Sequence, residues 1–148
     1  LKGIIQPVIR SQANYFIQKN LRYEIIGEDH TVLTDAKWVA FIFNQLLSNS
    51  IKYTPDHGNI MVSIKKEAQG VSLSVKDSGI GIPAEAQEHI FERFYRVDKS
   101  HSREIGGTGL GLAIARSAVV MHRGAIKVFS QPSEGTTFTV RIPLNYVS

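Results

Sequence analysis

Two amides and a lysine share one face of a predicted helix. Gln45, Asn49 and Lys52 follow a spacing of four and three residues, which places side chains on one helical stripe. The rest of this stripe is apolar, and a buried amide costs free energy unless it is hydrogen-bonded. An amide oxygen suits Mg²⁺, and a lysine offers a compact charge for phosphate. The alternative is that the two amides cap the backbone of a neighbouring loop.

An aspartate at the end of a predicted strand is the second candidate. Aliphatic residues at positions 71, 73 and 75 alternate with others, and the same period of two puts Asp77 on their buried face. A buried carboxylate needs a dedicated donor, which the exocyclic amine of a purine would supply. The next residues, Ser78-Gly79-Ile80-Gly81-Ile82-Pro83, let the backbone turn tightly beside a ligand. An aspartate that caps a tight turn is the alternative.

A second glycine-rich stretch, Gly106-Gly107-Thr108-Gly109-Leu110-Gly111-Leu112, leads directly into a predicted helix. Backbone N–H groups at a helix N-terminus form a site for an anion such as phosphate. The stretch lacks the Gly-Lys-Ser/Thr ending of a Walker loop, and its spacing differs from the dinucleotide fingerprint. A glycine-rich hinge that binds nothing is the alternative.

A long charged segment without a steady period lies between the two glycine-rich stretches. It begins Phe91-Glu92-Arg93-Phe94-Tyr95-Arg96 and carries four Lys/Arg and two Asp/Glu by Arg103. A connection of this length inside a compact domain is usually a functional lid or is disordered. Its arginines could reach a terminal phosphate, as arginines do in phosphoryl transfer. The alternative is a solvated loop with aromatic anchors.

The elements that must position these residues follow from periodicity and turn chemistry. Three longer helices and about five strands predict an α+β fold, a two-layer α/β sandwich with a mixed five-stranded sheet on three main helices. Neighbouring strands in the chain exclude a doubly wound parallel sheet. Helices are predicted over about 15 residues ending near 19–20 and over 35–53, 84–90 and 110–122, and strands over 21–25, 31–34, 60–64, 71–75, 125–130 and 136–144.

Composition sets the outer limits. The chain has 148 residues, 43% of them hydrophobic and 20% charged, which predicts one globular domain over residues 1–148 and excludes a disordered tail. It has no cysteine, so disulfides and Cys-built zinc sites are excluded. The formal net charge of +4 suits an anionic partner without identifying it. Because the first residue is Leu1 and no signal-peptide pattern follows, we expect a piece of a longer protein.

In this order, the motifs resemble one family, the catalytic ATP-binding domain of bacterial sensor histidine kinases. Residues 44–53 resemble its N box, 77–81 its first glycine box, 91–96 its F box, 107–112 its second glycine box and 135–138 its closing glycine-threonine motif. The resemblance covers about residues 1–144. It implies the Bergerat-type ATP fold shared with DNA gyrase, mismatch-repair ATPases and a heat-shock chaperone, and the F box favours the kinase branch.

The resemblance also implies a role for each matched residue. Asn49 would coordinate Mg²⁺ and Lys52 would contact a phosphate of ATP. Asp77 would accept the adenine amine, and Arg96 would steer the γ-phosphate from a lid at residues 91–108. The other nucleotide-binding residues would be Tyr53, Gly79, Gly81, Ile82, Arg93, Tyr95, Gly107, Thr108, Gly109, Leu110, Gly111 and Thr137, the last through water.

The chain departs from the family pattern at Gln45, where Asn or Glu is common. The glutamine keeps an amide oxygen that could coordinate Mg²⁺ less well or not at all, and it cannot act as a base. This departure leaves open a module that only binds nucleotide or regulates a partner. Nucleic-acid binding is disfavoured, because no helix with a basic face is predicted.

The implied activity is that of an ATP-dependent protein-histidine kinase. The γ-phosphate of ATP would pass to a histidine in a separate dimerisation domain, and then to a response-regulator aspartate. The acceptor histidine of the family is followed by an acidic residue, and none of the histidines at 30, 57, 89, 101 and 122 is. We therefore expect the acceptor before Leu1, with residues 1–20 as the helix that follows the dimerisation domain.

The resemblance finally implies partners and location. The expected partners are the dimerisation domain of the same protein, in a homodimer, and a response regulator. No nucleic-acid contact and no membrane contact by this domain itself are expected. We expect a cytoplasmic domain of a membrane-bound sensor.

Overall fold

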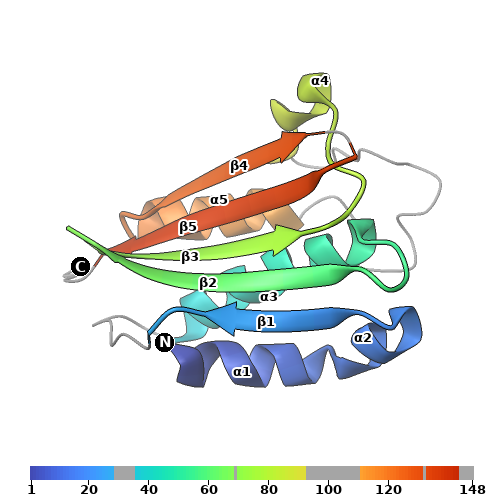
Figure 1. The fold of residues 1–148 in the computed structure, drawn as a ribbon. Helices are drawn as coiled ribbons and strands as arrows, with labels where there is room; N and C mark the ends of the chain where they lie inside the picture. Colours follow the sequence, from blue (N-terminus) through green and yellow to red (C-terminus); the bar gives the residue numbers. More distant parts are fainter. Residues whose placement is uncertain (29–35, 69, 93–110, 132, 144–148) are drawn as a thin grey trace.

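The computed structural model describes residues 1–28, 36–68, 70–92, 111–131 and 133–143. In this part of the chain, five strands form one mixed sheet and the longer helices cover one of its faces (Figure 1), which confirms the predicted α+β sandwich. The elements are α1 (Lys2–Ser11), α2 (Ala13–Lys19), β1 (Arg22–Ile26), α3 (Ala36–Tyr53), β2 (Asn59–Glu67), β3 (Gly70–Asp77), α4 (Ala84–Gln87), α5 (Gly111–Met121), β4 (Ala125–Gln131) and β5 (Gly135–Pro143).

The sheet has the spatial order β1-β2-β3-β5-β4. β1 runs parallel to β2, and the other neighbouring pairs are antiparallel. Alternation gives each central strand one buried face, because successive side chains point to opposite sides of a strand. The side chains on that face are Ile60, Val62, Ile64, Val71, Leu73, Val75, Phe138, Val140 and Ile142, each at most 4% exposed.

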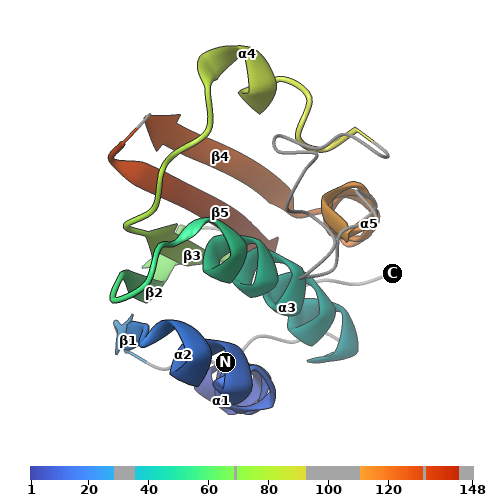
Figure 2. The ribbon, with the colours of Figure 1, turned by 90° about the vertical axis from the view of Figure 1, so that its right-hand side faces the viewer.

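Helix α3 is the central helix of the covering layer, and Figure 2 shows it between α1 and α5. Its apolar residues recur at helical spacing, so a broad stripe faces the sheet. Leu46, Leu47 and Ile51 are fully buried there. At its other end the Trp38 ring stacks on His122, just beyond α5, with ring centroids 4.3 Å apart and an interplanar angle of 3°. The polar stripe of α3 is thereby held in a fixed orientation relative to β3.

The first helix is broken, whereas periodicity predicted one continuous helix. Gln12 leaves the helical conformation at φ −106° and ψ 16° and separates α1 from α2. The Gln12 side chain forms a hydrogen bond with α3. Within α1 itself, Pro7 cannot donate the usual backbone hydrogen bond of a helix. The predicted helix at 84–90 is also shorter, since α4 ends at Gln87.

The predicted strand at 31–34 and Asp35, the first residue of the helix predicted over 35–53, lie outside the described residues. Within the described ranges, no helix is both long and apolar enough to cross a bilayer.

Candidate functional site

Asp77 lies at the buried end of β3 and is 2% exposed. Its Oδ1 atom accepts two backbone hydrogen bonds, from the N–H of Gly79 at 2.9 Å and of Thr136 at 3.1 Å. Burial raises the pKa of Asp77 above its ordinary value, and these two bonds, with a smaller effect from the Ser50 hydroxyl, offset part of the rise. A buried carboxyl group held by backbone N–H groups of the first glycine-rich loop and of β5 is therefore the centre of the site.

The first glycine-rich loop lies against the C-terminal end of α3. The backbone N–H of Ile80 donates to the carbonyl of Tyr53 at 3.3 Å. A Cβ atom on Gly79 would lie 2.3 Å from this same carbonyl oxygen and 2.9 Å from Oδ1 of Asp77. Gly81 has a φ of +79°, in the region that favours glycine. Both glycines are thus required by the path of the backbone.

Gly79→Ala is expected to destabilise the fold by about 1–3 kcal/mol, because its methyl group must displace backbone atoms. Gly3→Ala in α1 is the matched control, since a Cβ there meets nothing within 4 Å and alanine favours a helix. Urea unfolding followed by circular dichroism measures both. A Gly79→Ala chain as stable as the unaltered one would contradict the close approach of the loop to α3.

Ser130 of β4 and Gln87 of α4 hold the other side of this loop. The Ser130 hydroxyl accepts from the N–H of Ile82 at 2.7 Å and donates to the carbonyl of Gly135 at 3.1 Å. Gln87 Nε2 donates to the carbonyls of Ile82 at 2.8 Å and Ser130 at 2.9 Å. Ile82 itself is 1% exposed. The loop is therefore fixed on both sides.

The polar stripe of α3 lies beside Asp77 and the first glycine-rich loop. Gln45, Asn49, Lys52 and Tyr53 are all half-buried on that helix. Lys52 Nζ lies 5.3 Å from the centre of the Tyr53 ring. A Cβ atom on Gly111 would lie 2.1 Å from Oε1 of Gln45, so this amide oxygen lies against the start of α5. The N box on α3 thus contacts the first glycine-rich loop at its C-terminal end and the start of α5 at Gln45.

Part of the predicted site lies outside the described residues, namely Arg93, Tyr95, Arg96, Gly107, Thr108, Gly109 and Leu110. The start of the F box is described. The ring of Phe91 lies edge-on to Phe138, with centroids 6.4 Å apart at 82°, and the Arg116 guanidinium lies 5.9 Å from the Phe91 ring centre. The charged segment therefore begins at an aromatic contact with β5.

Thr137 is not brought to the Asp77 cluster. It is half-buried and pairs with Lys76, on the face of the sheet opposite to Asp77. The residue beside Asp77 is Thr136, which is 3% exposed and donates its N–H to the carboxyl. Alternation along β5 is the physical reason, because Thr136 shares the buried face of Phe138.

Sequence reasoning also missed Ser50, Ser130 and Gln87. Extending the alternation from Phe138 back by two residues would have found Thr136. The sequence carries no comparable signal for Ser130, whose partner Ile82 is 48 residues away. Gln87 carries no such signal either, since its amide reaches Ser130 across 43 residues.

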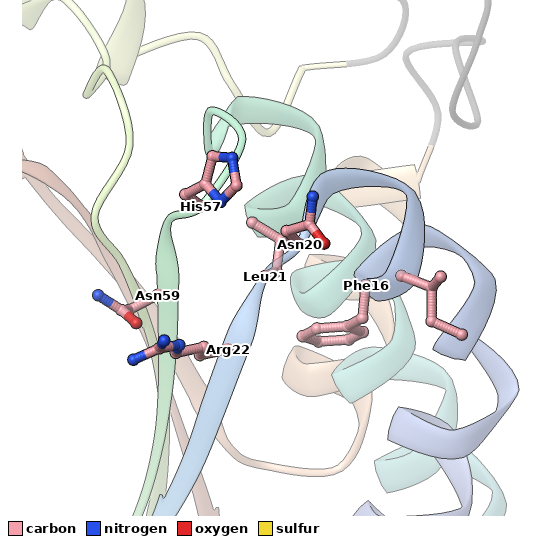
Figure 3. Close-up of a pocket in the computed structure, with 7 residues that line it drawn as sticks. Phe16, Asn20, Leu21, Arg22, His57 and Asn59 are labelled. Carbon is pink, nitrogen blue, oxygen red and sulfur yellow. The ribbon is translucent and has the colours of Figure 1, made fainter.

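A separate hollow of about 590 Å³ lies where α2, β1 and the turn before β2 meet (Figure 3). It contains none of the predicted site residues. Its lining residues are Phe16, Ile17, Asn20, Leu21, Arg22, His57 and Asn59.

Comparisons with known proteins identify a family that matches most of the chain. The family described as "Histidine kinase-, DNA gyrase B-, and HSP90-like ATPase" matches residues 34–146. The sensor-like histidine kinase SenX3 of Mycolicibacterium smegmatis is 41% identical over 121 residues, covering 82% of this chain and 30% of that protein. The sensor histidine kinase WalK of Bacillus subtilis is 40% identical over 136 residues, covering 82% of this chain and 22% of that protein.

Solved structures show the same fold. The catalytic domain of histidine kinase ThkA superposes with a TM-score of 0.82 at 28% identity, covering 97% of this chain and 92% of that one. ThkA in complex with the response regulator protein TrrA gives a TM-score of 0.79 at 26% identity, covering 98% of this chain and 40% of that one. The chain spans only 22% to 30% of the length of the two curated relatives. It belongs to the family of histidine kinase-, DNA gyrase B- and HSP90-like ATPases and is a catalytic ATPase domain like those of two-component sensor histidine kinases.

Proposed function

We propose that this chain holds Mg·ATP and, in its parent kinase, presents the γ-phosphate to a histidine of a separate dimerisation domain. The observation that carries the proposal is the buried Asp77 carboxyl, fixed between the first glycine-rich loop and β5. Both backbone N–H groups bond to Oδ1. The second carboxyl oxygen is then the acceptor for the adenine amine, with Gly79, Gly81 and Ile82 shaping the pocket for the base.

The phosphate end of the nucleotide would lie along the polar stripe of α3. Lys52 would contact a phosphate there, and Tyr53 would line the site. The start of α5 adds the positive end of a helix dipole, which favours phosphate. Arg96 and Arg93 would approach from the charged segment, with Tyr95 beside them. Residues 107–111 would complete the phosphate cradle.

Asn49 is the residue proposed to hold Mg²⁺. Among the described residues no group of three or more His, Cys, Asp or Glu side chains could hold a metal ion. An amide oxygen nevertheless fits magnesium, because this ion keeps several waters and is usually bound together with substrate phosphates. When bound, the ion would neutralise phosphate charge. Gln45 is the weaker ligand candidate, since its Oε1 lies against Gly111.

Phosphoryl transfer asks little covalent chemistry of the protein. The residues of this chain would orient the γ-phosphate for in-line attack and neutralise charge through Lys52 and Arg96. The histidine nitrogen of the dimerisation domain would be the nucleophile, and a response-regulator aspartate would receive the phosphoryl group next. The structure of ThkA with TrrA supports response regulators as partners, because ThkA is similar to 98% of this chain. We further propose that the chain is a cytoplasmic part of a membrane-bound sensor that acts as a homodimer.

A reconstitution experiment tests the proposal. The purified chain is mixed with the separately produced dimerisation domain of its parent protein, Mg²⁺ and ATP labelled at the γ-phosphate. We expect label on the acceptor histidine, and its transfer when the response regulator is added. ATP binding without labelled histidine would favour a module that only binds nucleotide. The departure from the family pattern at Gln45 leaves this alternative open. Absence of ATP binding would overturn the proposal.

A further inference from the structure

Two side chains of the first helical segment (residues 2–19, α1 and α2) form hydrogen bonds with helix α3. The first is Gln12, at the break between α1 and α2, which is 6% exposed. Its Nε2 atom donates to Oδ1 of Asn44 at 2.6 Å and to Oγ of Ser48 at 2.9 Å, with a longer bond of 3.3 Å to the Asn44 carbonyl. This contact fixes the middle of α3.

The second side chain is Lys19, at the end of α2, and it contacts the last turn of α3. Its Nζ atom donates to the carbonyl of Ile51 at 2.7 Å and to that of Thr54 at 2.8 Å, and lies 3.4 Å from the carbonyl of Lys52. The last carbonyls of a helix lack partners within the helix and lie at the negative end of its dipole. A half-buried ammonium group is therefore a strong C-terminal cap for α3.

A backbone bond fixes the same junction. The N–H of His57, in the turn after α3, donates to the carbonyl of Lys19 at 2.8 Å. Asn20 and His57 both have positive φ, 52° and 68°, and Figure 3 shows them close together where α2 meets this turn. Lys19 thus engages α3 through its side chain and the following turn through its backbone.

The turn that Lys19 caps is also the turn that carries the nucleotide residues. Lys19 takes the carbonyls of residues 51, 52 and 54, whereas the carbonyl of residue 53 accepts the N–H of Ile80 from the first glycine-rich loop. In the same turn, the Nζ atom of Lys52 lies 5.3 Å from the centre of the Tyr53 ring. A shift of the last turn of α3 would therefore move the loop beside Asp77 and the ammonium group of Lys52 together.

We propose that Lys19 is a positioning residue for the nucleotide site, acting through the C-terminal turn of α3. It lies outside residues 34–146, the segment that the family match covers. The helical segment before β1 is then part of the nucleotide-binding unit. The identity of the ligand rests on the proposed function, and the geometry of the contact does not.

The test compares three variants with the unaltered chain. Lys19→Met removes the cap and is expected to raise the Kd for ADP and the KM for ATP about tenfold, with kcat changed little. Lys19→Arg keeps a cation and is expected to restore most of the affinity. Gln12→Met breaks the other contact with α3, at Asn44 and Ser48, and is the control for a loss of stability alone. Calorimetric titration with ADP and thermal unfolding are measured on all four chains.

The outcomes separate the two roles. If Lys19 positions the site, the Kd for ADP of Lys19→Met is higher than that of Gln12→Met when the two variants lose the same Tm. The amide NMR signal of Ile80 is also expected to shift in Lys19→Met. Equal Kd values for both methionine variants, with the Ile80 signal unmoved, would overturn the positioning role. Failure of the unaltered chain to bind ADP would count against the proposed function instead, and the Ile80 signal in Lys19→Met would still decide the positioning role.

Discussion

Asp77→Asn is expected to weaken ATP binding by about 1–3 kcal/mol, or roughly 5- to 150-fold in Kd, while the chain stays folded. The asparagine retains a carbonyl oxygen for the N–H groups of Gly79 and Thr136, which both bond to Oδ1. Its second polar atom becomes a donor, which opposes the adenine amine. Calorimetric titration with ATP measures the loss.

The matched control is Asp56→Asn, which removes the same charge from an exposed position in the turn before β2. This variant is expected to bind ATP as the unaltered chain does. Unchanged ATP affinity in Asp77→Asn would remove Asp77 from the adenine pocket. A loss shared equally by both variants would indicate an effect of net charge.

Asp77→Asn has a second expected effect, on the stability of the folded chain. Burial raises the pKa of Asp77 in the folded chain above the ordinary 3.8. Between these two pKa values the folded chain binds more protons than the unfolded chain, so its free energy of unfolding falls as the pH rises through this window. The ionised carboxylate therefore costs stability above the raised pKa, and Asp77→Asn removes this cost.

Urea unfolding at several pH values tests this sign. We expect Asp77→Asn to gain stability relative to the unaltered chain at about pH 7, and the difference to shrink as the pH falls toward about 4. A stability difference that does not depend on pH would contradict the assignment. Because the variant is expected to bind ATP more weakly while unfolding less readily, its binding loss cannot be explained by unfolding.

Asn49→Ala is expected to lower phosphotransfer by about 10²–10³-fold, the effect of removing one preorganised group that acts on transition-state charge. The physical reason is the loss of the amide oxygen proposed to hold Mg²⁺ beside the phosphates. The reconstituted reaction, titrated with Mg²⁺, measures the rate, and a raised requirement for Mg²⁺ is expected along with the lower rate.

Asn44→Ala on the same helix is the matched control. Its amide oxygen accepts from Gln12 and thus lies on the side of α3 that contacts the first helical segment. We expect this variant to lose stability without a change in its Mg²⁺ requirement. If both alanine variants lose activity in proportion to stability, Asn49 has no special role toward the metal.

Local patterns carried much of the prediction. The period of two along β3 placed Asp77 on the buried face, because strand side chains alternate whatever the strand pairs with. Helical spacing placed Gln45, Asn49 and Lys52 on one half-buried stripe of α3 for a similar reason. The glycines at 79 and 81 were predicted from type alone, since few other residues tolerate such a backbone path.

Other features required the folded chain. The break at Gln12 could not be predicted from periodicity, which continues across it, because the amide that accompanies the break bonds to residues 32 and 36 positions away. The closing glycine-threonine motif predicted Thr137 near the base, but a short motif does not say which of two neighbours faces inward. Pairing with β3 decides that, and it places Thr136 at Asp77.

The sequence by itself determined the faces of the strands and helices, the position of the buried carboxyl and the family, since these depend on spacing within one element or one motif. Only the tertiary structure decided which elements meet at that carboxyl and what supports them. The contacts of Ser130 with Ile82, and of Lys19 with the end of α3, join residues more than 30 positions apart. Such contacts depend on how whole elements pack, and no local period encodes that.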